Sequence, residues 1–166
     1  MNNIFLGKGK LTGKGVYAAR DFAKGELVMS YNLKELSQVD FSALPKSEHM
    51  FTHSFYGKVY LYPEPARYVN HSADPNTQQD ISRMCDFATR PIKKGEMITT
   101  NATKEIENEI QTFIENKEQA TPKSISWLKK GYRNTECVFE VKGVKKKLVL
   151  KRIDGNWSVI KEEIVS

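Results

Sequence analysis

The pattern of apolar and polar residues changes near residue 103 of this 166-residue chain. Before that point, short apolar runs alternate with turns rich in Gly, Pro and Asn, which is typical of short β-strands. After it, apolar residues first recur at helical spacing and then alternate again. The pattern therefore predicts a mostly β (α+β) fold with two domains, residues 1–102 and residues 103–166.

The first part of the chain is expected to form several short strands. Alternating residues predict a hairpin over residues 15–32, with strands at 16–18 and 26–31 and a turn at 21–25. Residues 33–53 are less regular, and we expect a short helix there. Further strands are predicted at residues 58–62, 86–89 and 96–99.

The residues that follow position 103 predict an amphipathic helix. Ile106, Ile110, Phe113 and Ile114 are spaced by whole helical turns, so they fall on one face. Thr103 precedes this stripe and is expected to be the N-cap residue, because its hydroxyl can accept a hydrogen bond from the first turn.

The last part of the chain predicts a second helix and a β-meander. A Thr-Pro pair at 121–122, followed by Gly131, has the start and stop residues of a helix. Lys142-Gly143 and Asp154-Gly155 are suited to tight hairpin turns. The strands that they connect are predicted at residues 136–141, 147–153 and 156–164.

The stretch 68–76 is the most distinctive part of the chain. A short apolar strand end is followed by small, polar, turn-forming residues. The side chains of Asn70, Ser72, Asp74 and Asn76 can each bond to nearby backbone, and a proline fixes one φ angle. This predicts a rigid loop that presents main-chain N–H and C=O groups to a ligand, with an ordinary turn as the alternative.

The sequence Arg67–Asn76 resembles the signature of the SET-domain protein-lysine methyltransferases, in particular the small bacterial and viral members. Residues Gly13–Arg20 and Arg90–Thr99 resemble two further motifs of that family, in the same order. The resemblance covers roughly residues 5–102. It implies the SET β-fold, which has several short antiparallel sheets and a pseudoknot-like threading of the last motif. The C-terminal helix and β-meander would be an appendage.

The resemblance also implies an S-adenosylmethionine-dependent protein-lysine N-methyltransferase. A neutral amine must attack the methyl group in line, so lysine must lose a proton held with a pKa of about 10.4. A glycine turn lets the backbone approach the amino-acid end of the cofactor. By the same resemblance, the residues expected to bind the cofactor are Lys14, Gly15, Val16, Tyr17, Asn70 and His71, the last two through main-chain atoms.

The last motif departs from the family at one position, because Ala102 stands where the catalytic tyrosine is expected. Loss of one preorganised polar group costs roughly 10²–10³ in rate. Another tyrosine could serve instead, and Tyr60 is our catalytic candidate, with Tyr56 and Tyr62 as alternatives. Activity could also be weak, or the chain could be a catalytically degenerate SET module that binds a protein or the cofactor.

The net charge of +6 is concentrated in residues 129–152, where nine basic residues against two acidic ones give +7. Such a patch could attract nucleic acid or an acidic partner. A solvated β face is the favoured interpretation, because no regular interleaving of aromatic residues supports the stacking of bases.

The cysteine and histidine spacings predict no metal site. Cys85 and Cys137 lie 52 positions apart without a Cys-x-x-Cys pair. His49 and His53 are four positions apart and could share a helical face, but a polar surface is the favoured interpretation. Many eukaryotic SET enzymes carry a cysteine-rich zinc segment that this chain lacks. Trp127, Tyr132 and Trp157 could cover the lysine channel instead, although core packing is favoured for Trp157.

The chain contains no apolar stretch near the roughly 20 residues that span a membrane. A cytoplasmic protein is expected, although secretion signals of other kinds would leave no mark on this pattern. The abundance of Lys, Asn and Ile favours a bacterial or viral source. The expected partner is a protein that offers a lysine side chain, for example a histone or another basic protein.

Overall fold

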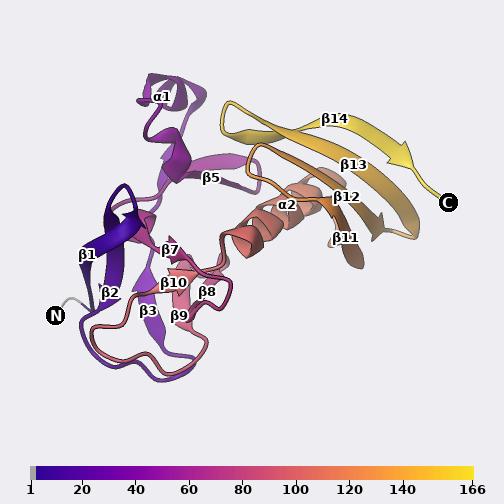
Figure 1. Cartoon of the computed structure of the whole chain (residues 1–166). Helices are drawn as coiled ribbons and strands as arrows, with labels where there is room; N and C mark the ends of the chain where they lie inside the picture. The colour runs from indigo at the N-terminus through magenta and orange to yellow at the C-terminus, as the bar shows by residue number, and fades with distance from the viewer. Residues whose placement is uncertain (1–2) are drawn as a thin grey trace. The chain divides into compact units, whose positions relative to one another are not determined.

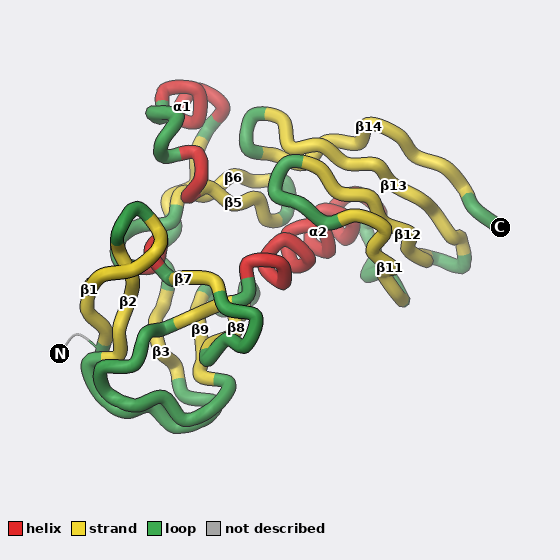
Figure 2. Tube along the Cα trace, in the orientation of Figure 1, coloured by secondary structure: helices red, strands yellow, loops and turns green. Residues whose placement is uncertain are grey.

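The computed structural model describes residues 3–166, and most of its regular structure is short β-strand (Figures 1 and 2). The predicted mostly β fold of short, mainly antiparallel sheets is confirmed. Several hairpins turn at a glycine with a positive φ angle, such as Gly57 in the hairpin of residues 52–61 and Gly143 in the hairpin of residues 134–153. Glycine adopts this backbone conformation without a steric penalty, so it suits these tight turns.

The chain packs into two compact units. The first unit contains residues up to Lys34 together with Tyr62–Ala102, and the second contains Glu35–Leu61 together with Thr103–Ser166. Residues 35–61 therefore pack with the C-terminal part of the chain. The predicted division into domains 1–102 and 103–166 stays a prediction.

The first unit consists of three small sheets. One is the antiparallel pair β1–β2, one is a three-stranded sheet in the order β3-β9-β8, and one is the parallel pair β7–β10. A short 3₁₀ helix, η2, precedes β7. The bounds are β1 Ile4–Leu11, β2 Lys14–Ala18, β3 Leu27–Ser30, η2 Ala66–Tyr68, β7 Asn70–His71, β8 Thr77–Asp80, β9 Cys85–Ala88 and β10 Thr99–Thr100.

The hairpin predicted over residues 15–32 is wrong, although both of its strands exist. β2 pairs with β1, and β3 pairs with β9. The connection between β2 and β3 bonds instead to the last motif, since the Phe22 and Ile92 main chains form a bridge and the Ala18 N–H donates to the Glu96 carbonyl over 2.9 Å. The strand predicted at 96–99 is reduced to an isolated bridge at Met97, followed by β10.

The second unit contains a three-stranded sheet and a four-stranded meander. The elements of residues 34–61 are β4 Lys34–Leu36, α1 Gln38–Ala43, the 3₁₀ helix η1 His49–Phe51, β5 Thr52–Phe55 and β6 Lys58–Leu61. The predicted short helix is α1, and Ser37 caps it in a capping box with Asp40. The C-terminal elements are α2 Ala102–Glu118, β11 Ser124–Lys129, β12 Asn134–Val141, β13 Val144–Ile153 and β14 Asn156–Ile164.

Helix α2 lies across one face of the four-stranded sheet (Figure 1). Its fully buried Ile110 and Ile114 pack with inward residues of the sheet, such as Phe139, Leu148 and Leu150. The predicted stripe is therefore confirmed as the buried face of α2. Thr103 is not the N-cap, because the helix begins one residue earlier and Thr103 lies within its first turn.

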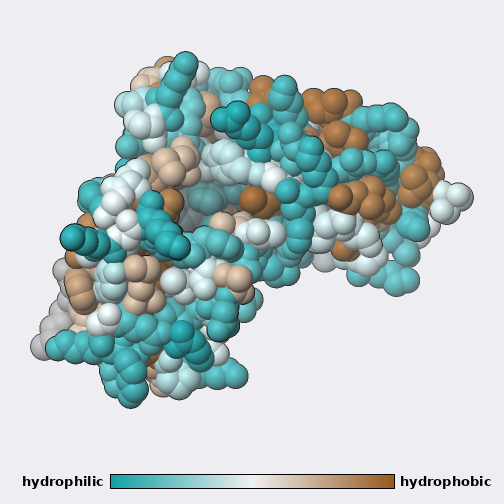
Figure 3. Space-filling model, in the orientation of Figure 1, coloured by the Kyte–Doolittle hydropathy of each residue, from teal (hydrophilic) through white to brown (hydrophobic). Residues whose placement is uncertain are grey.

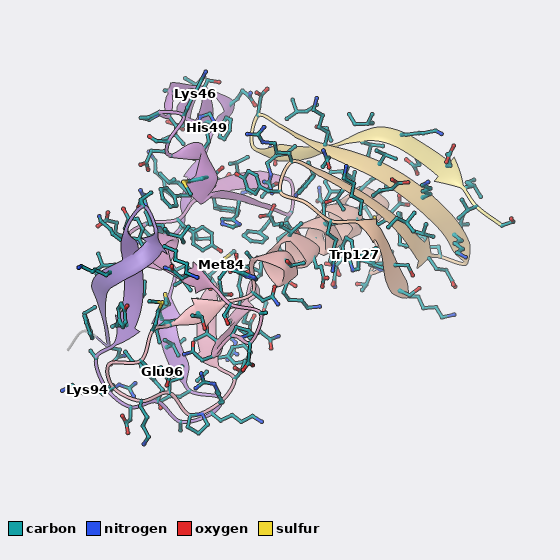
Figure 4. The ribbon with its side chains drawn as sticks, viewed as in Figure 1. Lys46, His49, Met84, Lys94, Glu96 and Trp127 are labelled. Carbon is teal, nitrogen blue, oxygen red and sulfur yellow. The ribbon has the colours of Figure 1, made fainter. Side chains whose placement is uncertain are left out.

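The predicted meander is confirmed, with both hairpin turns in the positive-φ conformation that suits type I′ turns. The helix predicted after Pro122 is wrong, since this segment is strand β11. Ile125 and Trp127 are two residues apart, lie partly buried against the core of the second unit (Figure 4 labels Trp127), and β11 pairs with β12. Strand periodicity and pairing outweigh the helix start and stop residues here.

The basic segment 129–152 forms part of this sheet, and several of its lysines are paired with carboxylates. Lys147 is 2.5 Å from Glu136, and Lys146 lies within 3.1 Å of both Glu118 and Glu162. Figure 3 shows scattered apolar side chains among polar ones over the sheet. The exposed apolar residues there include Leu128, Ile153, Ile160 and Ile164. Among the described residues, no helix is long and apolar enough to cross a membrane.

Candidate functional site

Asn70 joins the signature loop to the N-terminal hairpin. Its side chain is only 3% exposed. The Nδ2 group donates to the carbonyls of Lys14 (3.0 Å) and Tyr68 (2.8 Å), and Oδ1 accepts from the Lys10 N–H (2.7 Å). One amide thus fixes three main-chain groups from two segments. These bonds occupy both N–H groups of the side chain and engage its oxygen, so a ligand at this position would meet main-chain atoms.

Glycines in the β1–β2 hairpin allow a close approach of its two strands. A Cβ atom on Gly9 would lie 2.1 Å from the Lys14 carbonyl oxygen, closer than real atoms approach. A Cβ on Gly15 would lie 3.1 Å from the Lys8 oxygen and 3.4 Å from Asn70 Nδ2. Gly13 has a φ of +78° and forms the hairpin turn. Bare backbone is therefore a requirement at this edge of the loop.

Lys14 presents a cation on this hairpin. Its Nζ is 3.3 Å from the Tyr68 hydroxyl and 3.4 Å from Glu64 Oε1, and it lies over the Tyr68 ring. The hydrogen bond with Tyr68 and the nearby Glu64 carboxylate raise the pKa of Lys14. The ammonium is half-exposed, so it remains accessible to an anionic group.

The other two predicted hairpin residues differ in exposure. Val16 is fully buried and packs inside the first unit. The Tyr17 hydroxyl donates to the Lys8 carbonyl over 2.6 Å, and its ring stacks on Phe5. Tyr17 therefore stiffens the hairpin, while Val16 anchors it.

His71 lies beside the residue where the family places its tyrosine. The Ala102 N–H donates to His71 Nδ1 over 3.1 Å, so a proton of the neutral ring lies on Nε2. The pairing of β7 with β10 sets this geometry, because His71 stands opposite Thr100 and the Ser72 N–H donates to the Thr100 carbonyl. The signature loop and the last motif are therefore neighbours.

The rest of the loop is cross-bonded, but of the described side chains of Ser72, Asp74 and Asn76 only that of Ser72 makes the local bond that the sequence predicted. The Ser72 hydroxyl and the Asp74 main chain bond to each other. Asn76 is 1% exposed, and its amide accepts from the Thr99 N–H (2.8 Å) and donates to the Met97 carbonyl (2.8 Å). Asn76 also donates to Glu96, which is labelled in Figure 4. Asn76 thus holds the last motif rather than its own turn.

The three candidate tyrosines fall in different places. Tyr56 lies in a turn of the second unit and is exposed. Tyr60 lies on β6, also in the second unit, with its ring 6.4 Å from that of Phe55. Tyr62 belongs to the first unit, as do Asn70, His71 and Ala102. It is buried, and its hydroxyl accepts a 2.6 Å hydrogen bond from Gln79.

His49 and His53 do not share a helical face, and the predicted helical arrangement of this pair is wrong. His49 lies in η1 and His53 in β5. His53 Nδ1 is 2.8 Å from Glu109 Oε1, and Glu109 Oε2 accepts from Arg152 and, over 2.9 Å, from Trp157 Nε1. Sequence reasoning missed this cluster, because a glutamate in an amphipathic helix is normally exposed.

The aromatic residues of the second unit have distinct surroundings. Trp157 is buried in the core, as favoured from the sequence. The Tyr132 hydroxyl donates to the His49 carbonyl over 2.8 Å, and its ring lies under the Arg152 guanidinium. Covering a lysine channel stays a prediction for Trp127 and Tyr132.

The comparisons with known proteins agree on one family. The family model of the SET domain matches residues 13–101. The histone-lysine N-methyltransferase trr of Drosophila melanogaster is 29% identical over 123 residues, which is 65% of this chain and 5% of that protein. Human histone-lysine N-methyltransferase 2D is 26% identical over 113 residues, 59% of this chain and 2% of that protein.

A solved structure shows the same fold. It is the inhibitor-bound, humanized mutant of the Polycomb Repressive Complex 2 of Chaetomium thermophilum, with a TM-score of 0.50 at 26% identity. The match covers 59% of this chain and 15% of that chain. This chain therefore spans only a small share of the length of the two curated relatives named above.

Proposed function

Because the chain belongs to the SET-domain family, we propose that it is an S-adenosylmethionine-dependent protein-lysine N-methyltransferase. One observation carries the proposal: Asn70 fastens the signature loop to the glycine hairpin, while His71 of the same loop bonds to Ala102 of the last motif. Three motifs that are far apart in sequence therefore meet within the first unit.

The residues of the hairpin fit the amino-acid end of the proposed cofactor. Gly15 keeps the backbone free of a side chain, and Lys14 supplies a cation for a carboxylate. Val16 and Tyr17 support this strand, and the main chain of Asn70 and His71 would meet the adenosine. When bound, the cofactor supplies an electrophilic methyl group on a sulfonium.

The chain itself must orient the lysine amine and exclude water from it. For the group that replaces the missing tyrosine at Ala102, Tyr60 is the candidate from the sequence. Tyr62 is the alternative that lies in the same compact unit as Asn70. The proposed acceptor is a lysine of a histone or another basic protein, in keeping with the histone-lysine enzymes among the relatives.

Calorimetric titration with S-adenosylmethionine and with its demethylated product tests the proposal. We expect micromolar binding by the wild-type chain and none by the Asn70→Ala variant, because three main-chain groups lose their hydrogen bonds. Asn116→Ala, at an exposed position of α2, is the matched control and should bind normally. No binding of either ligand by the wild type would contradict the proposal.

A second candidate function follows from Ala102. The absence of a hydroxyl at this position favours a SET module that binds a protein or the cofactor without turnover. The variant Ala102→Tyr separates the two, since a gain in methyl transfer to histones would show that only this hydroxyl was missing. If cofactor binding is intact and neither the wild type nor Ala102→Tyr transfers methyl groups, the binding module is the better account.

A further inference from the structure

A polar pair is buried beside the three-stranded sheet of the first unit. Gln79 on β8 is 7% exposed and Tyr62 is 6% exposed, and Gln79 Nε2 donates to the Tyr62 hydroxyl over 2.6 Å. Among the described residues, the other end of this amide, Oε1, is buried without a hydrogen-bond partner. Buried polar atoms of native proteins are almost always bonded, so this acceptor calls for a donor.

The surroundings of the pair favour a cationic or N–H-donating ligand. Asp86 stands directly opposite Gln79 in the β8–β9 ladder, which places both side chains on the same face of the sheet. Asp86 is buried, and a buried carboxylate attracts positive charge. The Tyr31 ring packs on that of Tyr62 at a centroid distance of 5.1 Å, which gives this polar group an aromatic wall.

This face of β8 is turned toward the strand that leads to Ala102. Thr77 and Gln79 are two residues apart, so their side chains leave the strand on the same side. The Thr77 hydroxyl donates to the Thr99 carbonyl of β10 over 2.9 Å. Strand β10 ends at Thr100, two residues before Ala102. The pair therefore lies on the side of β8 that faces the end of the last motif.

We propose that the Tyr62 hydroxyl and the free Gln79 oxygen receive the ε-amine of the substrate lysine, in place of the tyrosine absent at residue 102. The inference rests on the proposed methyltransferase function and names the residues that serve it. A neutral primary amine has two N–H donors and one lone pair. Two acceptors on one side of the nitrogen hold both N–H groups and leave the lone pair free.

The chemistry balances without a further reactant. The lysine nitrogen forms a bond to the methyl carbon while the carbon–sulfur bond breaks, and the sulfur leaves as a neutral thioether. The positive charge passes to the nitrogen, which then releases a proton to solvent. Tyr62 and Gln79 form no covalent bond, so their contribution is orientation of the amine by two acceptor oxygens.

Methyl transfer from radiolabelled S-adenosylmethionine to purified core histones tests the proposal, with labelling of the chain's own lysines read in the same assay. We expect Tyr62→Phe to lower kcat by roughly 10²–10³, the usual loss for one oriented polar group. Cofactor affinity measured by calorimetry should not change. Tyr60→Phe and Tyr56→Phe are compared in parallel, and a larger loss at either of them overturns the assignment to Tyr62.

Variants of Gln79 separate catalysis from a merely structural role. Gln79→Leu removes the acceptor and should lower kcat for the folded fraction, whereas Gln79→Glu keeps an acceptor and should retain more activity. If the pair only stabilises the fold, both variants would lower the melting temperature and leave kcat unchanged, and the proposal falls.

The two hypotheses fail in different ways. If the wild-type chain methylates neither histones nor itself, the proposed function is wrong, and this inference is wrong with it. A wild-type chain that is active, with Tyr62→Phe equally active, overturns only the assignment of Tyr62 and Gln79.

Discussion

The buried asparagines at the candidate site of the first unit and the buried glutamate of the second unit serve their surroundings in different ways. In the first unit, the buried amides of Asn70 and Asn76 bond mainly to main-chain groups. In the second unit, the fully buried Glu109 carboxylate is surrounded by His53, Arg152 and Trp157. A neutral amide both donates and accepts, so it positions backbone without introducing charge. A buried carboxylate such as Glu109 requires positively charged or N–H-donating partners, so it links the elements that carry those partners.

The charges in the second unit depend on one another. Burial alone would raise the pKa of Glu109, but the hydrogen bond from His53 and the charge of Arg152 outweigh it and lower that pKa. Burial alone would lower the pKa of His53, yet the hydrogen bond to Glu109 raises it overall. β5, α2, β13 and β14 each contribute one member, so the cluster connects the inserted segment 35–61 to the C-terminal part.

Removal of the carboxylate charge should have the largest effect on stability. Glu109→Gln leaves the Arg152 guanidinium buried without its counter-charge, and breaking a buried pair costs about 3–5 kcal/mol. Urea unfolding measures the loss. Glu115→Gln, on the same helix but only partly buried, is the control. Equal stability of the two variants would mean that the cluster contributes nothing beyond packing.

Introduction of a charge at Asn70 tests the other side of the comparison. Asn70→Asp replaces an N–H donor with a carboxylate oxygen that faces the Lys14 and Tyr68 carbonyls. We expect a loss of roughly 2–3 kcal/mol, since both carbonyl oxygens would lose their donor. Chemical unfolding monitored by circular dichroism checks this. A stability equal to that of the wild type would show that the amide hydrogen is not needed there.

The pH dependence of unfolding should distinguish the two units. Because the folded pKa of Glu109 lies below 4.5, its stabilisation is present above that pH and is lost as pH falls through the folded value. Because the folded pKa of His53 lies above 6.5, its stabilisation is present below pH 6.5 and is lost as pH rises through the folded value.

The cluster should therefore stabilise the second unit most between about pH 4.5 and 6.5. Both tryptophans, Trp127 and Trp157, belong to this unit, so tryptophan fluorescence follows its unfolding selectively. His53→Gln should abolish the decline above pH 6.5 while it keeps the decline at low pH. A flat profile for the wild type would contradict the coupling of these two groups.

The smallest effect is expected at the sheet surface. Lys147 and Glu136 form a pair whose side chains are both about 30% exposed. Exposed pairs contribute about 0–1 kcal/mol, so Lys147→Gln should change the free energy of unfolding by less than about 1 kcal/mol. Denaturant unfolding in low and high salt provides the measurement. A loss comparable to that of Glu109→Gln would mean that burial is not what distinguishes the two clusters.

Local patterns predicted the meander and helix α2 correctly, because their turns and spacings lie within a few residues. The prediction of a hairpin over 15–32 failed because β2 pairs with β1 and β3 pairs with β9. The sequence of a strand does not determine which other strand it pairs with. The helix predicted after Pro122 failed because the pairing of Ile125 and Trp127 with β12 outweighs local start and stop residues.

The candidate site shows the same limit. The sequence singled out Asn70 and His71 as expected cofactor contacts, which stays a prediction. It gave no sign that the Asn70 amide would bond to Lys10 and Lys14, more than 50 residues away. Glu109 and Gln79 gave no sign of burial, since each is polar and has no distinctive neighbours in the sequence. Such roles arise from tertiary packing, which decides whether a polar side chain is enclosed.

The composition of the second unit has a consequence for how such chains evolve. An internal segment and a terminal segment build it jointly, so the chain crosses between the units at residues 34–35, 61–62 and 102–103. A single recombination event near residue 102 would exchange residues 103–166 and leave residues 35–61 without the residues that they pack against. Residues 35–61 and residues 103–166 should therefore be inherited together in descendants of this chain.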